Sequence, residues 1–258
     1  MELDQTITAI VPQQQVRFKT INRQLHLLLP SPQAFTDADG NNNPVLSWEE
    51  ILQQLEQRLA GTERFWEEQT PVYVQVGDRL LDVPQLQEIN TALASYNLKL
   101  KQIITCRRQT AINAVTAGFS VEQVTKEALP FGSSEGVPTE DPLYIKMTVR
   151  SGTEIRHGGS VIIFGDVNAG AEIIADGDIL VWGKLRGLAH AGARGNLQAV
   201  VMALHFQPTQ LRIAHLIADF PTAPPVNPEI AYVENEEVIV VKRAMEYEAK
   251  SASFWLRA

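Results

Sequence analysis

The feature of this sequence that most constrains its fold is a six-residue periodicity in the second half of the chain. Every sixth residue from 159 to 195 is glycine or alanine: Gly159, Gly165, Ala171, Gly177, Gly183, Ala189 and Gly195. The residues one position later are polar, and those two and four positions later are apolar or small. A six-residue repeat in which several positions each keep one type of residue is typical of a β-helix, whose short strands wind as coils around a thin interior.

The first half of the chain lacks this period and alternates strand-like with helix-like segments. In order, these are a strand at 16–29, a helix at 48–59, a strand at 72–76, a helix opened by Pro84, a strand at 98–104 and a helix at 112–119. The order β-α-β-α-β-α predicts a small α/β domain, with a sheet backed by helices.

Between the two halves lies a stretch rich in glycine, proline and acidic residues, which favours a flexible linker. We therefore expect a two-domain protein. Its segments are an N-terminal tail at 1–13, an α/β domain at 14–119, a linker at 120–142, an all-β triangular β-helix with hexad repeats at 143–243 and a C-terminal extension at 244–258.

Composition narrows the class of protein. The chain has 258 residues, a net charge of −8 and one cysteine, Cys106. A single cysteine excludes an internal disulfide and a cysteine-rich zinc site, and the negative charge disfavours binding to nucleic acid. No apolar run approaches the ~20 residues of a membrane span, and the N-terminus lacks the features of a secretory signal. We expect a soluble cytoplasmic protein without a metal or a cofactor.

The coil geometry predicts which residues lie together. If three hexads make one coil, residues 18 apart stack on the same face. The outward residues of one face are then Ile162, Phe164, Leu180, Trp182, Gln198 and Val200, and most of them are apolar. An exposed apolar surface of this size usually marks an interface, so we expect self-association. The alternative is that another segment of the chain covers this face.

The next face is polar. The same 18-residue spacing predicts that Arg150, Asn168 and Arg186 stack on one another, with Gly152, Gly170 and Leu188 stacked beside them. Two interpretations stay open on the residues alone. The glycines could simply form the corners of the coils, with the arginines exposed to solvent. Alternatively, the small residues could let the backbone of another protein approach closely.

Several strings on this face carry a family resemblance. They are Val149-Arg150-Ser151-Gly152, the run AGAEIIADG at 169–177 and the run LRG at 185–187. Over about residues 143–243 the sequence closely resembles the C-terminal domain of the MinC family of bacterial septum-site-determining proteins. The first half is similar to the family's N-terminal domain in element order, in the strand around Lys19 and in the block from Pro71 to Ile104.

The resemblance implies a function in cell division. MinC proteins inhibit assembly of the tubulin-like division protein FtsZ through their N-terminal domain, where Lys19 matches a family lysine. Their β-helix forms a homodimer and binds MinD, a membrane-associated ATPase. The MinD-binding motif falls on Arg150, Ser151, Gly152 and Gly170, and Asn168 and Arg186 share that face. The resemblance thus implies a non-enzymatic, cytoplasmic inhibitor that MinD recruits peripherally to the inner face of the cell membrane.

Two other functions remain as alternatives. The first is a bactofilin-like scaffold, whose β-helices also repeat glycine and aliphatic residues and polymerise end to end. The second is a hexapeptide-type acyltransferase, in which His190, at the polar position of its hexad, would act as a general base.

The sequence also departs from the usual MinC pattern at three positions. Many members have glycine in place of Thr20, glutamine in place of Thr153 and arginine in place of Leu188.

Overall fold

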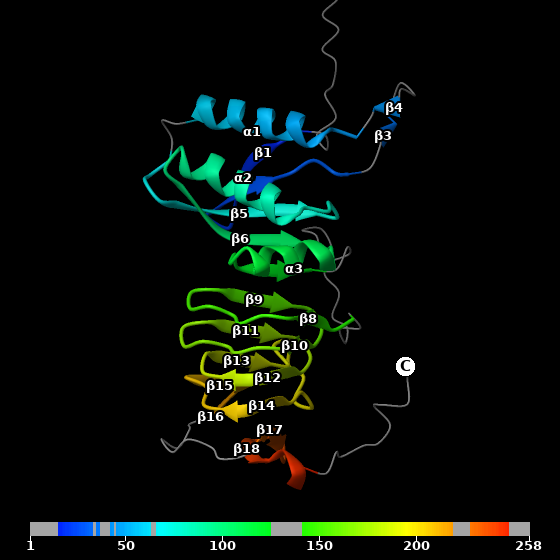
Figure 1. The fold of residues 1–258 in the computed structure, drawn as a ribbon, viewed down its shortest axis with the longest axis vertical. Helices are drawn as coiled ribbons and strands as arrows, with labels where there is room; N and C mark the ends of the chain where they lie inside the picture. The colour runs from blue at the N-terminus through cyan, green and yellow to red at the C-terminus, as the bar shows by residue number, and fades with distance from the viewer. Residues whose placement is uncertain are drawn as a thin grey trace, which may run out of the picture.

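The structure, a computed structural model, describes residues 15–32, 35–36, 42–43, 45–62, 66–124, 141–218 and 228–247. The expected tail at 1–13, most of the expected linker and residues 248–258 of the extension lie outside these ranges. Figure 1 shows an elongated molecule with helices at one end and a stack of short strands at the other. We call residues 15–124 the α/β part and residues 141–247 the coils. No helix among the described residues is long and apolar enough to span a bilayer.

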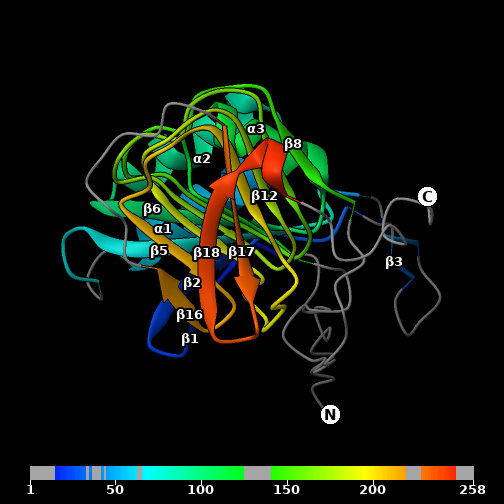
Figure 2. The same ribbon diagram turned by 90° about the horizontal axis from the view of Figure 1, so that it is seen from below.

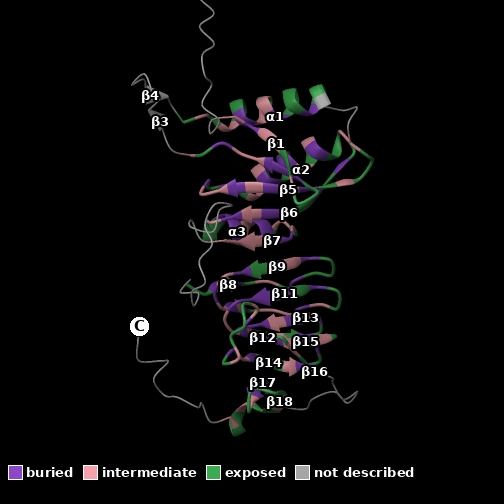
Figure 3. Ribbon diagram, turned by 180° about the vertical axis from the view of Figure 1, so that it is seen from behind, coloured by how far each residue is buried: buried purple, intermediate pink, exposed green. Residues whose placement is uncertain are grey.

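The α/β part alternates strands and helices. Its elements are β1 (Arg17–Ile21), β2 (Gln24–Leu28), β3 (Phe35–Thr36), β4 (Asn42–Asn43), α1 (Trp48–Thr62), β5 (Thr70–Gly77), α2 (Val83–Ala94), β6 (Leu98–Thr105), α3 (Arg108–Thr116) and β7 (Val121–Gln123). Helices α1, α2 and α3 lie against one face of the strands (Figures 1 and 3).

The single strand expected at 16–29 is an antiparallel hairpin of β1 and β2. Asn22 and Arg23 between them have φ of 50° and 65°. Two consecutive residues with positive φ form the two-residue turn that best matches strand twist. The prediction of one strand was wrong because the usual signal for such a turn, a glycine after the asparagine, is missing here.

Local sequence explains where the first two helices begin. The Ser47 hydroxyl accepts a hydrogen bond from the Glu50 N–H at 3.3 Å, and the Glu50 carboxylate accepts one from the Ser47 N–H at 2.7 Å. Asp82 and Gln85 form the same reciprocal cap at the start of α2. Apolar residues at helical spacing then fill the core, namely Ile51, Leu55, Leu59, Leu86, Ile89 and Leu93.

The coils contain two stacks of strands. The first sheet holds β8 (Leu143–Ile145), β10 (Val161–Ile163), β12 (Ile179–Leu185) and β14 (Val201–Phe206) in parallel, followed by antiparallel β17 (Glu229–Glu234) and β18 (Val238–Arg243). The second sheet contains β9 (Glu154–His157), β11 (Glu172–Ala175), β13 (Leu188–Ala191) and β15 (Gln210–Ile213) in parallel, and antiparallel β16 (Leu216–Ala218). A short 3-10 helix, η3 (Ala244–Glu246), follows β18.

A third side joins the two stacks in each coil. Val149, Val167 and Leu185 form parallel bridges there, and all three side chains are buried. Figure 2, which looks along the stack, shows the coils superposed with β17 and β18 nearest the viewer. Alternate residues such as Val161 and Ile163 point into the interior, which is why the repeat requires small or aliphatic side chains there.

The three-hexad coil length holds only at the start of the stack. Val161 pairs with Leu143 and with Ile179, its equivalents three hexads before and after. Later, Glu172 pairs with Leu188 rather than with His190, and Ile179 pairs with Val201 rather than with Leu197. One coil is thus shorter and the next longer than expected.

The constant spacing expected throughout was therefore wrong beyond residue 185. The shorter coil follows from the Gly187 corner, where a Cβ would lie 2.4 Å from the Ala171 carbonyl oxygen. The longer coil follows from extra residues in the turn at 192–199.

One sheet runs through both parts of the molecule. Its order is β1-β2-β5-β6-β7-β9-β11-β13-β15-β16, so β7 lies between β6 of the α/β part and β9 of the first coil. Both pairings are parallel. Residues 121–123, which were expected to belong to the linker, are thus part of a sheet. A strand of three residues is too short to carry a recognisable alternation, so the pattern did not reveal it.

Candidate functional site

The expected polar face is built from two equivalent turns. In the first coil the Thr153 N–H donates to the Arg150 carbonyl at 3.1 Å, and in the second the Ala171 N–H donates to the Asn168 carbonyl at 3.0 Å. The Gly152 N–H donates to the Gly170 carbonyl at 2.8 Å and joins the two turns. Equivalent positions of successive coils therefore lie side by side here. We call Arg150, Ser151, Gly152, Asn168, Gly170 and Arg186 the polar turn face.

The two glycines of this face are needed for different reasons. Gly152 has φ of +82° and Gly170 has φ of +79°, in the left-handed region that disfavours other residues. A Cβ on Gly152 would meet nothing within 4 Å, whereas one on Gly170 would lie 2.5 Å from the Ser151 hydroxyl. Both glycines are exposed. The face thus presents bare backbone to solvent at two neighbouring positions.

The arginines of the face differ in how they are held. Arg186 donates to the Asn168 side-chain oxygen at 2.7 Å and lies 3.8 Å from the Asp166 carboxylate. Within the described ranges, the exposed guanidinium of Arg150 has neither a hydrogen-bond nor an ion-pair partner. Arg186 is therefore preoriented, and Arg150 keeps its full set of donors for an external acceptor. Leu188, predicted beside Gly170, pairs with Glu172 instead because of the shorter coil.

The apolar face lies on the other sheet of the coils. Phe164 stacks on Trp182 with ring centroids 5.8 Å apart, and Tyr144 lies 5.2 Å from Phe164. The exposed fraction is 63% for Trp182, 42% for Phe164 and 39% for Leu204. The flanking residues Ile162, Leu180 and Met202 are half-buried and pair across neighbouring strands. We call Tyr144, Ile162, Phe164, Leu180, Trp182, Met202 and Leu204 the apolar ladder.

Val200 does not belong to the apolar ladder, contrary to the expectation from the hexads. Leu180 pairs with Met202, so the longer coil moves Val200 and Gln198 out of the stack. Val200 instead donates its N–H to the Asp178 carboxylate at 2.9 Å. Burial raises the pKa of Asp178, and this hydrogen bond lowers it.

Three residues of the apolar ladder were missing from the sequence-based set. Tyr144 could have been found, because it occupies the position three hexads before Ile162, with which it pairs. Met202 and Leu204 could not, because only the changed coil length brings them into the stack.

Lys19, the residue matched to FtsZ inhibition, lies far from both surfaces of the coils. It is exposed on β1, opposite His26 of β2. Five strand intervals of about 4.8 Å separate β1 from β9, so Lys19 is about 24 Å from the first coil along the sheet. His26 is buried under Tyr73, with ring centroids 5.2 Å apart, and burial lowers its pKa.

His190, the candidate base of the acyltransferase alternative, is engaged in the fold. Its Nε2 lies 2.8 Å from the carbonyl oxygen of Ala214, so this nitrogen carries a hydrogen and donates a hydrogen bond to the backbone. A nitrogen held in this way is not available to remove a proton from a substrate. This hydrogen bond gives the alternative no support.

Comparison with known proteins bears on the identity of the chain. The family model described as "Septum formation inhibitor MinC, C-terminal domain" matches residues 143–244. The probable septum site-determining protein MinC of Thermosynechococcus vestitus is 52% identical over 196 residues, which cover 75% of this chain and 74% of the relative. The chain belongs to the MinC family. This membership places it in bacterial cell division, among inhibitors of septum formation.

Other proteins, including one of known structure, are also similar to this chain. The protein of Gloeobacter violaceus is 45% identical over 240 residues, covering 91% of this chain and 81% of the relative. That of Nostoc is 43% identical over 232 residues, covering 88% of this chain and 62% of the relative. A chain of the solved MinC:MinD cell division protein complex of Aquifex aeolicus is 41% identical, with a TM-score of 0.39 over 43% of this chain and 91% of that one.

Proposed function

We propose that this chain prevents septum formation at wrong sites by antagonising the assembly of FtsZ, and that MinD recruits it from the cytoplasm to the inner face of the cell membrane. In this proposal the α/β part, including Lys19, acts on FtsZ, and the coils, as a triangular β-helix, bind MinD and form a homodimer. The chain acts by binding, without a catalytic step, metal or cofactor. Membership of the MinC family and the geometry of the polar turn face support the proposal.

The observation that carries MinD binding is the hydrogen bond from Gly152 to Gly170, which brings two exposed glycines together. Without side chains at these positions, the backbone of a partner can come within hydrogen-bonding distance. Beside them, Arg150 offers unpaired donors, and Asn168 and Asp166 orient Arg186. Such a face suits a partner that presents carboxylates or backbone carbonyls, and a buried charge-assisted contact of Arg150 would contribute on the order of 1.5–3 kcal/mol.

The apolar ladder supports a homodimer. Trp182, Phe164 and Leu204 are exposed large apolar side chains in one stripe. Burial of each contributes on the order of 1.5–3 kcal/mol before the cost of association. A self-complementary stripe of this kind suits a two-fold axis, in which each copy covers the ladder of the other.

One feature disfavours the end-to-end scaffold. A β-helix polymerises through the open strand edges at its two ends. Here β7 pairs with β9 at the first coil, and the antiparallel pair of β17 and β18 follows the last parallel strand of its sheet. One strand at each end of the coils therefore has a partner in the same chain, β9 in β7 and β14 in β17, whereas β8, β16 and β18 are edge strands of their sheets.

Co-sedimentation with MinD, ATP and lipid vesicles tests the MinD assignment. Gly152→Asp adds a charge where a Cβ has open space, so it changes the face with little effect on packing. The matched control is Gly152→Asn, which tolerates the left-handed backbone and adds similar bulk without charge. We expect Gly152→Asp to lose most binding, Gly152→Asn to lose less, and Arg150→Ala to bind more weakly than Arg150→Lys. Folded Gly152→Asp and Arg150→Ala variants that reach the vesicles like the wild type would refute the assignment.

A further inference from the structure

The α/β part and the coils meet at a joint centred on Ser120 and β7. The Ser120 carbonyl accepts a hydrogen bond from the Ile103 N–H of β6 at 2.9 Å. The Ser120 hydroxyl accepts one from the Glu154 N–H of β9 at 3.0 Å. One residue therefore links the sheet of the α/β part to the first coil, through its backbone on one side and its side chain on the other. Val121 and Ile155, Cα partners beside this link, are both fully buried.

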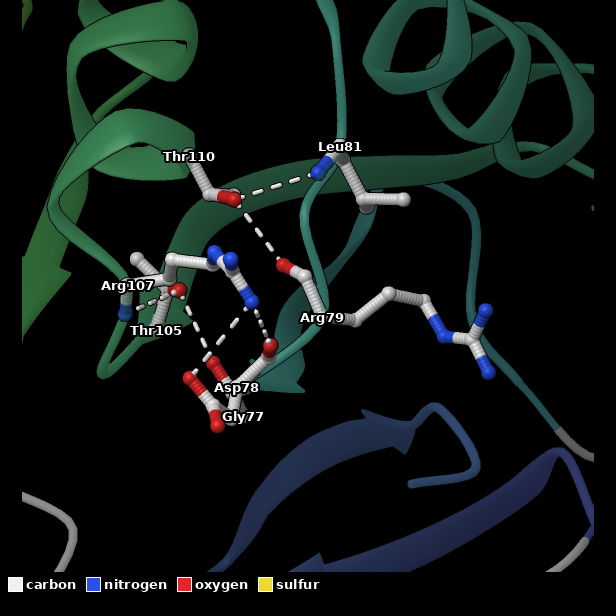
Figure 4. Close-up of polar contacts among 7 residues, drawn as sticks. All are labelled: Gly77, Asp78, Arg79, Leu81, Thr105, Arg107 and Thr110. Carbon is white, nitrogen blue, oxygen red and sulfur yellow. Dashed lines mark hydrogen bonds and ion pairs between the residues drawn. The ribbon is translucent and has the colours of Figure 1, made fainter. Parts of the chain in front are cut away.

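Helix α3 is fixed firmly within the α/β part. The Thr110 hydroxyl accepts from the Leu81 N–H at 3.1 Å and donates to the Arg79 carbonyl at 2.9 Å (Figure 4). The Thr105 hydroxyl accepts from the Arg107 N–H at 3.0 Å and donates to the Gly77 carbonyl at 2.9 Å. The first turn of α3 is thus tied to the loop after β5. At its other end, the Gly118 N–H donates to the Val115 carbonyl at 2.9 Å, and the Phe119 N–H donates to the Ala114 carbonyl at 2.9 Å.

That far end faces the polar turn. Val115, Thr116 and Gly118 line one side of a crevice of about 10 Å³, and residues 147–150 and Thr153 line the other. The end of α3 and the segment before the polar turn thus face each other across this crevice. Thr153 is buried, and its N–H closes the Arg150 turn while its carbonyl accepts from the Glu172 N–H of the next coil. The turn is therefore bracketed by α3 and Ser120 on one side and by the second coil on the other.

We propose that the docked α/β part holds the Arg150–Thr153 turn in its binding conformation, with Ser120 as the positioning residue of the joint. Opening the joint loosens this turn and weakens binding at the polar turn face. Docking of the α/β part and binding of a partner to the coils are then coupled, and by linkage a bound partner also stabilises the joint. The inference rests on the proposed function for the identity of that partner.

The test uses the full chain with Ser120→Ala, which removes the acceptor for the Glu154 N–H, and Ser120→Thr, which keeps a hydroxyl. The control is Ser95→Ala, because Ser95 is exposed at the end of α2 and its hydroxyl donates to the Thr91 carbonyl of the same helix. Hydrogen exchange of residues 150–156 reports on the turn, and co-sedimentation with MinD, ATP and vesicles reports on binding. Circular dichroism checks that each variant is folded.

We expect Ser120→Ala to speed exchange at 150–156 and to weaken vesicle binding roughly fivefold to tenfold, as for the loss of one partly buried hydrogen bond. Ser120→Thr should restore both, and Ser95→Ala should change neither. Unchanged exchange in Ser120→Ala, or faster exchange with unchanged binding, would overturn the proposal. If the wild type itself does not bind MinD, the proposed function fails, and exchange at 150–156 still decides whether Ser120 holds the turn.

Discussion

At the scale of single residues, glycine marks positions where the fold excludes a side chain, but the reasons differ. At Gly152 the backbone angle is the constraint and space is open, whereas at Gly187 the constraint is contact with backbone oxygens of Ala171 and Asn168. The sequence shows a glycine in both places and cannot distinguish them. It did, however, predict that Gly152 and Gly170 are neighbours, because both lie in the coils that keep the three-hexad spacing.

These two reasons predict different stability losses. Gly187→Ala should lower the free energy of unfolding by about 1–3 kcal/mol, since its Cβ would lie 2.4 Å from a backbone oxygen that cannot move without shifting a coil. Gly152→Asn should cost less than about 1 kcal/mol, because asparagine tolerates the left-handed conformation. Urea unfolding of both variants measures the difference. Equal losses would show that the Gly187 corner has more room than the structure indicates.

His157 gives a prediction for pH. Its side chain is buried, and burial lowers its pKa to about 4 from about 6.5 in an unfolded chain. Above pH 6.5 the ring is neutral in both states, so its contribution to stability is complete. As the pH falls from 6.5 to 4 the unfolded chain binds a proton that the folded chain does not, so up to about 3 kcal/mol of stability is lost. The stability measured by urea unfolding between pH 7 and 4 should therefore fall more steeply for the wild type than for His157→Gln. Equal slopes would contradict the assignment.

At the scale of elements, the hexad pattern predicted the first coils and the alternation of their side chains, because each strand must place every second residue in a narrow interior. It failed after Leu185, where the coil is shortened at the Gly187 corner and then lengthened by the turn at 192–199. Glycine and alanine still recur at every sixth residue there, but residues 18 apart no longer pair between strands. The hairpin of β1 and β2 and the short strand β7 were missed because neither carries a sufficiently long period.

The corrected pairing changes which residues should control self-association. Trp182→Asp and Leu204→Asp each place an unpaired charge in the apolar ladder and should split the proposed homodimer without unfolding the coils. Val200→Ser should leave the dimer intact, because Val200 lies outside the ladder. Sedimentation equilibrium measures all three. Dimers that persist in both aspartate variants, or that dissociate in Val200→Ser, would show that another face forms the interface.

At the scale of the whole molecule, the continuous sheet holds the surfaces in a fixed relation. Lys19 lies at one end of this sheet, the polar turn face is at a corner of the first coils, and the apolar ladder is on the other sheet. The periodicities of the sequence predicted the two parts and most residues of both faces, but a linker was expected to begin where β7 continues the sheet. A joint depends on contacts between residues distant in sequence, and no periodicity within either half reports them.

The central claim is that this chain antagonises FtsZ assembly, and sedimentation of FtsZ polymers with GTP tests it most directly. The protein is added without MinD, and the pelleted fraction of FtsZ is measured against the protein concentration. We predict that the wild type lowers the pelleted fraction, and that the folded Gly152→Asp variant lowers it equally, because the face that this substitution alters is the one proposed to bind MinD. A pelleted fraction that stays unchanged with excess wild-type protein would contradict the claim.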